Sequence, residues 1–128
     1  MIILDTSFWI ALIKQDDKNN QSARSIAKTI PYEDLIILDH VYSETMTVLR
    51  NKASEQDCKN FMNFIKDTKI KIILSDEEFF AAATAIFFLN KKLSFTDCLI
   101  LVSANGMGSE LITFDKELEK AWREPELQ

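Results

Sequence analysis

The chain has 128 residues, enough for one compact domain and too few for two ordinary ones. Apolar residues make up 47% of it and charged residues 27%, which excludes a disordered tail. The net charge of −5 is unusual for a protein that binds nucleic acid, because phosphate binding normally calls for a basic surface. Either the substrate is not a nucleic acid, or cations turn an acidic pocket into one that binds phosphate.

The N-terminal segment and the two cysteines favour a cytoplasmic protein. The segment MIILDTSFWIALIK has no basic start and carries Asp5 within its apolar stretch, which is atypical of a signal peptide. Apolar runs elsewhere are short and interrupted by charges, so no membrane span is predicted. Cys58 and Cys98 have no CxxC spacing, and we expect both to be free, mostly buried thiols.

Four short apolar runs alternate along the chain with longer segments of helical spacing. Runs that are apolar throughout are typical of strands covered on both faces, as in a parallel sheet. The predicted strands are residues 2–4, 35–38, 70–74 and 111–113. The predicted helices are 8–14, 20–29, pairs starting near 40 and 54 and near 76 and 96, and a short one after Asp115. This order predicts one domain over residues 1–128 with an α/β fold, a three-layer α/β/α sandwich around a mostly parallel sheet of four or five strands.

Helix-start and helix-stop signals support these boundaries. Ser54 with Asp57, and Ser75 with Glu78, fit the spacing of a capping box. Gly106 is expected to end the second helix of the third pair. Because the chain has only 2 glycines, it has no glycine-rich phosphate-binding loop.

Acidic residues follow the predicted strands close to where each one ends. The carboxyl ends of parallel strands share one edge, and ligands of open α/β sheets bind beyond that edge. Two further acids, Glu44 and Asp97, lie in helices that begin near the same edge. The acids after the strands are, in chain order, Asp5, Asp39, Asp76 and Asp115.

Each acid also has an ordinary structural explanation. Asp5 and Asp115 can cap the helices that follow them, and Ser94 with Asp97 fits a capping box. Glu44 lies in an amphipathic helix. A carboxylate within the apolar stripe of that helix would need a partner, whereas one at the margin would be solvated. Both interpretations stay open for each residue taken alone.

Taken together, Asp5, Glu44, Asp97 and Asp115 predict a site for one or two divalent cations. Four converging carboxylates cannot all stay ionised without a countercharge. Carboxylate oxygens and water are ligands that Mg²⁺ and Mn²⁺ prefer, with substrate phosphate filling open positions. The expected reaction is hydrolysis of a phosphodiester by water. Hydroxyl groups beside the acids are candidates to orient them or to hold water near the metal: Thr6, Ser7, Ser94, Thr96 and Thr113.

The segments ILDTS, LSFTD and LITFD, with Glu44 in a helix after the second strand, resemble the PIN-domain family and most of all its compact VapC-type toxins. The resemblance covers nearly the whole chain in the expected order. It implies an Mg²⁺- or Mn²⁺-dependent endoribonuclease that acts on RNA and is commonly a homodimer. It also implies a cognate antitoxin protein, a segment of which occupies the acidic groove. The residues expected to be catalytic and to bind the metal are Asp5, Glu44, Asp97 and Asp115.

The chain departs from the family pattern at two places. The customary glycine-rich turn is absent, and Asp39 stands where small hydroxyl residues are common. We favour a helix-capping role for Asp39 over an added charge in the site. The lone histidine, His40, is expected at a helix start rather than as a general base, so a Ser-His-Asp relay is poorly supported.

Basic side chains are candidates to hold the RNA backbone on either side of a metal-filled pocket. An ordinary solvated face explains the same residues equally well. The first candidates are Arg50, Lys52 and Lys14, followed by Lys18, Arg24 and Lys28.

Three other functions compete with a toxin ribonuclease. A receiver-like signalling module also gathers acids at a parallel sheet edge, but only one acid follows the first strand here. A PIN-like scaffold that binds RNA or protein without cleaving is disfavoured because all four acids are present. A PIN nuclease that cleaves DNA or matures RNA stays open. Base stacking by aromatics occurs in RNA-binding proteins, but four phenylalanines are expected in the core or a dimer contact: Phe79, Phe80, Phe87 and Phe88.

Overall fold

The structure of the protein is a computed structural model that describes residues 1–124, in which helices alternate with short strands. In chain order the elements are β1 (Ile2–Leu4), α1 (Thr6–Ile13), α2 (Asn20–Ala27), a 3₁₀ turn η1 (Tyr32–Asp34), β2 (Leu35–Leu38), α3 (Asp39–Lys52), α4 (Glu55–Thr68), β3 (Lys71–Ile73), α5 (Glu77–Leu89), α6 (Phe95–Met107), β4 (Glu110–Ile112) and α7 (Lys116–Arg123).

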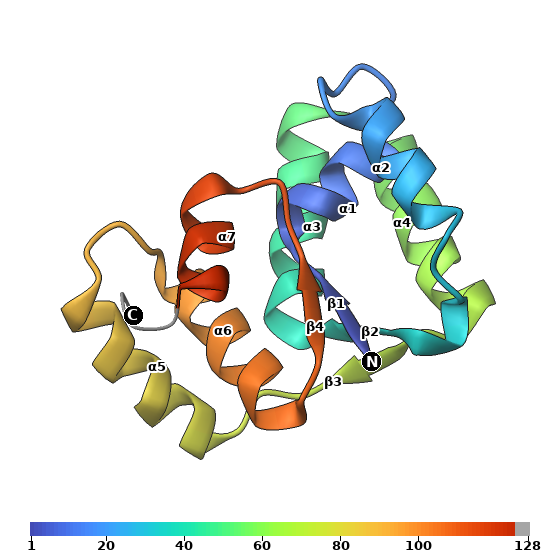
Figure 1. The fold of residues 1–128 in the computed structure, drawn as a ribbon. Helices are drawn as coiled ribbons and strands as arrows, with labels where there is room; N and C mark the ends of the chain where they lie inside the picture. Colours follow the sequence, from blue (N-terminus) through green and yellow to red (C-terminus); the bar gives the residue numbers. More distant parts are fainter. Residues whose placement is uncertain (125–128) are drawn as a thin grey trace.

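The strands form one sheet of order β3-β2-β1-β4, in which every pair is parallel. The crossovers from β1 to β2 and from β2 to β3 run one way across the sheet, and the crossover from β3 to β4 runs back. Because parallel crossovers are right-handed, this reversal moves the connecting helices to the other face. Accordingly α1–α4 pack together on one side and α5–α7 on the other (Figure 1). The predicted three-layer sandwich is confirmed, with four strands.

The predicted strand boundaries agree with the structure to within one residue. β1 and β2 match the predicted ranges, β3 is one residue shorter at each end than 70–74, and β4 covers 110–112 in place of 111–113. Residues 125–128 of the predicted domain lie outside the described part of the chain. Cys58 and Cys98 are free and buried, as predicted. Among the described helices, none is long and apolar enough to cross a membrane.

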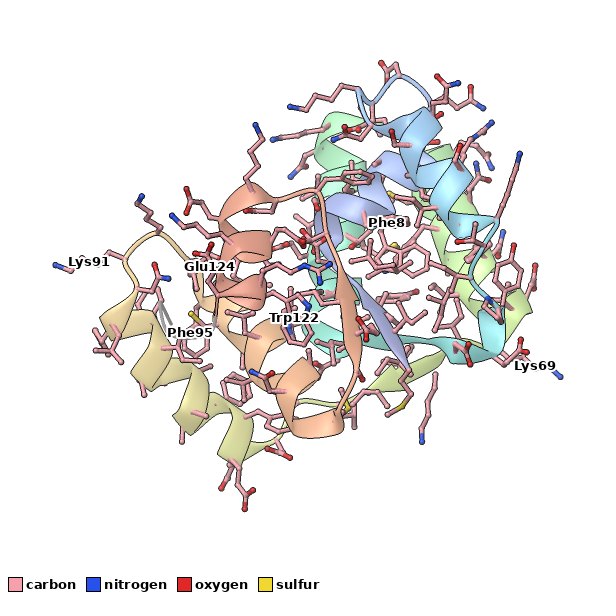
Figure 2. All side chains as sticks on the ribbon, in the orientation of Figure 1. Phe8, Lys69, Lys91, Phe95, Trp122 and Glu124 are labelled. Atoms are coloured by element: carbon pink, nitrogen blue, oxygen red, sulfur yellow. The ribbon has the colours of Figure 1, made fainter. Side chains whose placement is uncertain are left out.

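Aromatic packing holds α1 on both of its sides. The Trp9 ring meets Phe61 and Phe64 of α4 edge-on, with centroid distances of 5.4 and 5.9 Å. Phe8 stacks on Phe114, beyond β4, at 5.3 Å, and lies deep inside the molecule (Figure 2). Burying a large apolar side chain contributes about 2–3 kcal/mol. The start of α1, which follows Asp5, is therefore firmly placed.

Two of the predicted helix signals are wrong. α6 runs past Gly106 to Met107 and is capped by Gly108, whose φ of +62° lies in the left-handed region that favours glycine. A Cβ on Gly106 would lie 2.8 Å from the Phe79 ring, so the absence of a side chain there lets α5 approach α6 closely. The capping box predicted at Ser75 does not form, because Asp76 caps α5 by accepting a hydrogen bond from Phe79 N at 2.9 Å.

Ser75 instead ties the end of β3 to the end of β2. Its hydroxyl donates to Asp39 Oδ1 at 2.7 Å, and its backbone N–H donates to Asp39 Oδ2 at 3.2 Å. Burial alone would raise the pKa of Asp39, but the hydrogen bonds from Ser75 and His40 outweigh it and lower that pKa. The capping role favoured for Asp39 is wrong, because Asp39 is the first residue of α3 and Leu38 stands at the N-cap position. His40 follows at the helix start, as predicted.

Candidate functional site

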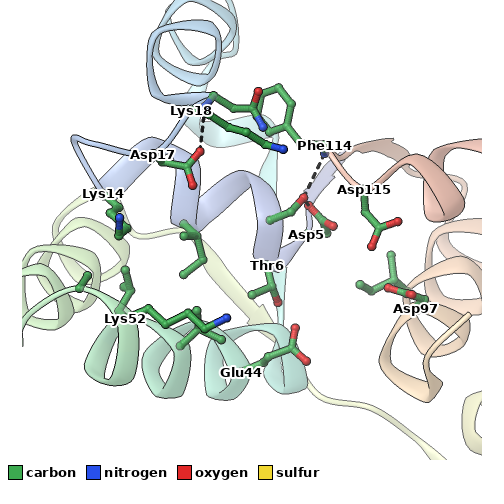
Figure 3. A pocket seen from close by; sticks show the side chains of 17 residues that line it. Asp5, Thr6, Lys14, Asp17, Lys18, Glu44, Lys52, Asp97, Phe114 and Asp115 are labelled. Carbon is green, nitrogen blue, oxygen red and sulfur yellow. Dashed lines mark hydrogen bonds between the residues drawn. The ribbon is translucent and has the colours of Figure 1, made fainter.

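A cavity of about 560 Å³ opens at the carboxyl edge of β1 and β4. The crossovers that adjoin these two strands lie on opposite faces, so this edge is where the strand order reverses and where open α/β sheets bind ligands. Asp5 and Asp115 reach the cavity from the strand ends, Glu44 from α3, and Asp97 from the first turn of α6 (Figure 3). The fold thus brings all four predicted acids to one cavity.

Asp5 is held in a single orientation at the cavity wall. The residue is 4% exposed. Its Oδ1 accepts hydrogen bonds from Ser7 Oγ at 2.7 Å and Phe8 N at 3.0 Å, and its Oδ2 accepts one from Thr113 Oγ1 at 2.6 Å. Both lone pairs of Oδ1 are therefore used, and one lone pair of Oδ2 is left for a ligand.

The same two hydroxyl groups join the end of β1 to the end of β4. Ser7 Oγ accepts a hydrogen bond from Phe114 N at 3.0 Å, and Thr113 Oγ1 accepts one from Asp115 N at 2.9 Å. These bonds fix where Asp115 lies relative to Asp5. Ser7 and Thr113, both expected to orient the acids, contact Asp5 directly.

Asp115 and Asp97 each cap a helix, which is the ordinary structural role that the sequence allows for them. Asp115 Oδ1 accepts hydrogen bonds from Glu117 N at 2.9 Å and Leu118 N at 3.1 Å. Asp97 Oδ2 accepts one from Ser94 N at 3.2 Å, and Asp97 N donates to Ser94 Oγ at 3.1 Å, which completes a capping box. In each acid only one carboxylate oxygen is used within residues 1–124. Capping and ligand binding are therefore compatible, because the cap orients the carboxylate and leaves its second oxygen unused.

Glu44 is exposed, at the margin of the apolar stripe of α3. It lines the cavity with Val48 and Lys52, which follow at four-residue spacing on the same helix face. Within the described residues its side chain makes no hydrogen bond or ion pair. Glu44 is therefore a solvated carboxylate that is available to a ligand.

Within residues 1–124, no basic residue forms an ion pair with any of the four cavity acids. Their negative charge is therefore not neutralised by ion pairs in this part of the chain. Burial raises the pKa of the Asp5 carboxyl, and the negative charge of Asp115 raises it further. Burial also raises the pKa of Asp97, with the charges of Asp115 and Glu44 adding to the effect. Both shifts mean that a positive charge in the cavity would stabilise the ionised acids.

The side chains present fit a hard divalent cation. All the candidate donors are oxygens, as Mg²⁺ and Mn²⁺ prefer, and Mg²⁺ usually keeps several waters beside one or two carboxylates. The acids surround the cavity and do not crowd together, since residues 1–124 contain no group of three His, Cys, Asp or Glu side chains poised to hold a metal. Thr6 Oγ1 is buried with no hydrogen-bond partner in that range and lies between Asp5 and Glu44 (Figure 3). The identity of the metal ligands stays a prediction.

Of the other residues predicted to bind RNA or to support the acids, some line the cavity and others lie outside it. Lys14 and Lys52 line the cavity, whereas Arg50 lines a separate hollow between α3 and α4 with Met46 and Met62. Lys14 Nζ is paired with an acid of its own loop, at 2.6 Å from Asp16 Oδ1. Neither Ser94 nor Thr96 lines the cavity, and Ser94 acts on it only through its hydrogen bonds to Asp97.

The loop between α1 and α2 contributes three residues to the cavity. Lys18, a predicted candidate for RNA contact, lines it together with Asp17 and Asn19, for which the sequence predicts no role. The loop is ordered by side-chain hydrogen bonds, since Asp17 Oδ2 accepts one from Asn19 N at 2.9 Å and Asn20 Nδ2 donates to Ala11 O at 2.8 Å. Hydrophobic periodicity carries no information on where such a loop lies, so Asp17 and Asn19 could not be placed at the site from the sequence.

Among models of protein families, that of the PIN domain matches residues 2–123 of this chain. A search of the curated proteins gives no match.

Three solved structures have a fold similar to that of this chain. The structure of VapC20 from Mycobacterium tuberculosis, described as a toxin that cleaves the sarcin-ricin loop, has a TM-score of 0.85 and 20% identity, covering 94% of this chain and 95% of that one. A toxin–antitoxin complex from Klebsiella pneumoniae gives 0.69 and 22%, covering 91% and 88%. FitAcB from Neisseria gonorrhoeae gives 0.74 and 16%, covering 96% and 94%. At these identities the similarity establishes the fold.

Proposed function

Because this chain belongs to the PIN-domain family, we propose that it is a metal-dependent endoribonuclease that hydrolyses RNA phosphodiester bonds in the cavity at the carboxyl edge of β1 and β4. The observation that carries the proposal is the convergence on that cavity of four acids from four different parts of the chain. The proposed metal-binding and catalytic residues are Asp5, Glu44, Asp97 and Asp115.

The metal would be Mg²⁺ or Mn²⁺, held by the unused carboxylate oxygens of these acids. When bound, such an ion lowers the pKa of water and offsets the charge of the attacked phosphate. The protein contributes the rest. Asp5 is fixed by three hydrogen bonds, and Ser7 and Thr113 hold Asp115 in register with it. The capping box fixes Asp97, and Glu44 faces the cavity from α3. A pre-oriented set of ligands spares the site from reorganising during the reaction.

The test is a cleavage assay with purified protein on mixed RNA and on single-stranded DNA, in Mg²⁺, in Mn²⁺ and in EDTA. We expect RNA to be cleaved in either metal, with more than about 100-fold loss in EDTA. Preferential cleavage of the DNA would mean that DNA, and not RNA, is the substrate. Cleavage that persists in EDTA would rule out the proposed mechanism.

We propose further that the protein is the toxin of a toxin–antitoxin pair in the cytoplasm and that its partner is a cognate antitoxin protein. Support comes from the similar structures, one of which is described as a toxin that cleaves the sarcin-ricin loop and another as a toxin–antitoxin complex. Expression of the chain should arrest growth of its host. Co-expression of the antitoxin should restore growth and inhibit RNA cleavage by the purified pair.

We also propose that two copies pair through α5. This helix packs mainly on α6, and its only buried residue is Ala83. The phenylalanines expected in the core or a dimer contact are partly exposed, with Phe88 at 73% and Phe80 at 45%, and Leu89 is 75% exposed. The segment from 79 to 89 carries no charge. An uncharged apolar patch can face its own copy across a two-fold axis without like-charge repulsion.

Phe88→Glu is expected to convert the dimer to a monomer, because a buried carboxylate without a partner is costly at an interface. The dimer dissociation constant, measured by analytical ultracentrifugation, should rise by at least about 100-fold. Met62→Glu serves as the control, since Met62 is 41% exposed and lies on α4. A wild-type protein that is monomeric at all concentrations would contradict the proposed dimer.

A further inference from the structure

The cavity has an acidic end and a basic end. The four acids lie at one end, and Lys14, Lys18 and Lys52 line the other together with one acid, Asp17 (Figure 3). The two ends share one wall, the stripe of α3 that runs from Glu44 through Val48 to Lys52. Lys52 follows Glu44 by eight positions, so their backbones are separated by about 12 Å along the helix axis.

Two of the three lysines are free to bind an anion. Lys14 is paired with Asp16, whose proximity raises the pKa of Lys14. Lys18 and Lys52 are exposed, and within residues 1–124 neither makes an ion pair or a side-chain hydrogen bond. Lys18 comes from the α1–α2 loop and Lys52 from the end of α3, so they approach the cavity from two different walls (Figure 3). The loop that carries Lys18 is held by the hydrogen bond from Asn20 to Ala11.

The cavity is also lined by apolar side chains. Of these, Ile10 and Val48 are partly exposed, whereas Leu49 and Ile100 are almost fully buried. Val48 lies between Glu44 and Lys52 along α3. An apolar floor beside sites for phosphate matches the chemistry of a nucleotide chain, in which each ribose links two phosphates and carries a base with apolar faces. Bases can reach such a floor only when they are unpaired, because pairing turns their faces into the helical stack.

We infer that Lys18 and Lys52 each hold a backbone phosphate of a single-stranded RNA segment, a few nucleotides from the cleaved bond, while an unpaired base covers Ile10 and Val48. The inference rests on the proposed ribonuclease function and names its substrate class. A duplex strand advances about 3.4 Å per nucleotide, so the separation of about 12 Å corresponds to at most about four nucleotides. Lys18 and Lys52 are thus positioning residues, and Arg50 and Lys14 are not needed for this contact.

The test uses the full chain and the double variant Lys18→Ala/Lys52→Ala. The matched control is Lys66→Ala/Lys91→Ala, which removes the same charge from exposed residues outside the cavity. The probes are a short mixed-sequence single-stranded RNA and the same sequence within a duplex. Binding is measured by fluorescence anisotropy in Ca²⁺, and cleavage in Mg²⁺, each over a range of salt concentrations.

For the single strand, the cavity variant should bind about tenfold more weakly and show a KM raised by about the same factor, with kcat changed less than about threefold. The slope of log affinity against log salt should fall by about 1.4, which is about 0.7 for each lost contact to a single strand. The control variant should match the wild type, and the duplex should bind more weakly than the single strand.

The outcomes separate the two proposals. Wild-type cleavage combined with unchanged affinity and salt slope in the cavity variant would overturn the lysine assignment and leave the ribonuclease proposal standing. RNA binding that depends on the two lysines, without cleavage in any metal, would support the assignment and reject the nuclease. Equal or tighter binding of the duplex would overturn the single-strand preference, and a wild type that neither binds nor cleaves RNA would overturn both proposals.

Discussion

Replacing Asp5 with Asn is expected to lower kcat/KM for RNA by roughly 10³-fold while the protein stays folded. Changes to residues that merely orient a metal ligand commonly cost 10- to 100-fold, so loss of a ligand charge should cost more, by about a further factor of ten. Asn caps helices about as well as Asp, so the hydrogen bond from Phe8 N can persist. The measurement is steady-state cleavage across an Mg²⁺ titration, with circular dichroism to check the fold.

Asp76→Asn is the matched control for this variant. Asp76 caps α5 through its hydrogen bond from Phe79 N, much as Asp5 caps α1, but it does not line the cavity. Its replacement should leave kcat/KM within about twofold of the wild type. Comparable losses in the two variants would mean that Asp5 acts through the helix cap alone, and full activity of Asp5→Asn would exclude it as a metal ligand.

Adding Mg²⁺ or Mn²⁺ is expected to raise the melting temperature of the wild type, and EDTA to lower it. At a metal concentration of about 100 times the dissociation constant, binding to the native state adds about 2.7 kcal/mol. For a domain of this size that corresponds to roughly 10 °C. Thermal unfolding followed by circular dichroism measures the shift. Asp5→Asn should lose most of it and Asp76→Asn none, and a wild type that does not respond to any divalent cation would contradict the metal site.

The metal-free protein should also show a defined pH dependence. The pKa of Asp5 is raised in the folded state, mainly by burial, so around that pKa the folded protein binds more protons than the unfolded chain. The corresponding contribution to the free energy of unfolding is present below the ordinary carboxyl pKa and is lost as the pH rises through the raised pKa. In EDTA, the stability of Asp5→Asn relative to wild type should therefore increase from about pH 4 to about pH 7. Mg²⁺ should shrink that difference, and a difference that falls with pH would contradict the raised pKa.

Much of the architecture follows from local patterns in the sequence. Runs such as 35–38 are apolar at every position, which is typical of strands covered on both faces, and all four residues of β2 are indeed buried. The alternation of such runs with helical segments dictates a parallel sheet, whose strand ends must share one edge. For that reason, Asp5 and Asp115 could be assigned to the same edge before the structure was known.

Other features depended on contacts between residues distant in the sequence. Ser75 fits a capping box locally, yet it bonds to Asp39, because the pairing of β2 with β3 brings the two together. Gly106 resembles a helix end, yet its role is set by the Phe79 ring on the neighbouring helix. Local signals of this kind are degenerate, and packing decides between their alternatives.

The candidate site likewise has features that follow from local sequence and features that depend on distant contacts. Residue types and spacing identified the four acids and the hydroxyl groups beside Asp5, because chemistry at strand ends and helix starts can be read from the sequence. Spacing alone did not reveal that Glu44 is solvated, that Arg50 faces a different hollow, or that Lys18 lines the acidic cavity. Those positions depend on how α3 is rotated against the sheet and how the α1–α2 loop folds over it. Both are set by burial of side chains from distant elements, so the sequence by itself determined the chemical groups of the site, and only the tertiary structure decided which of them share a cavity.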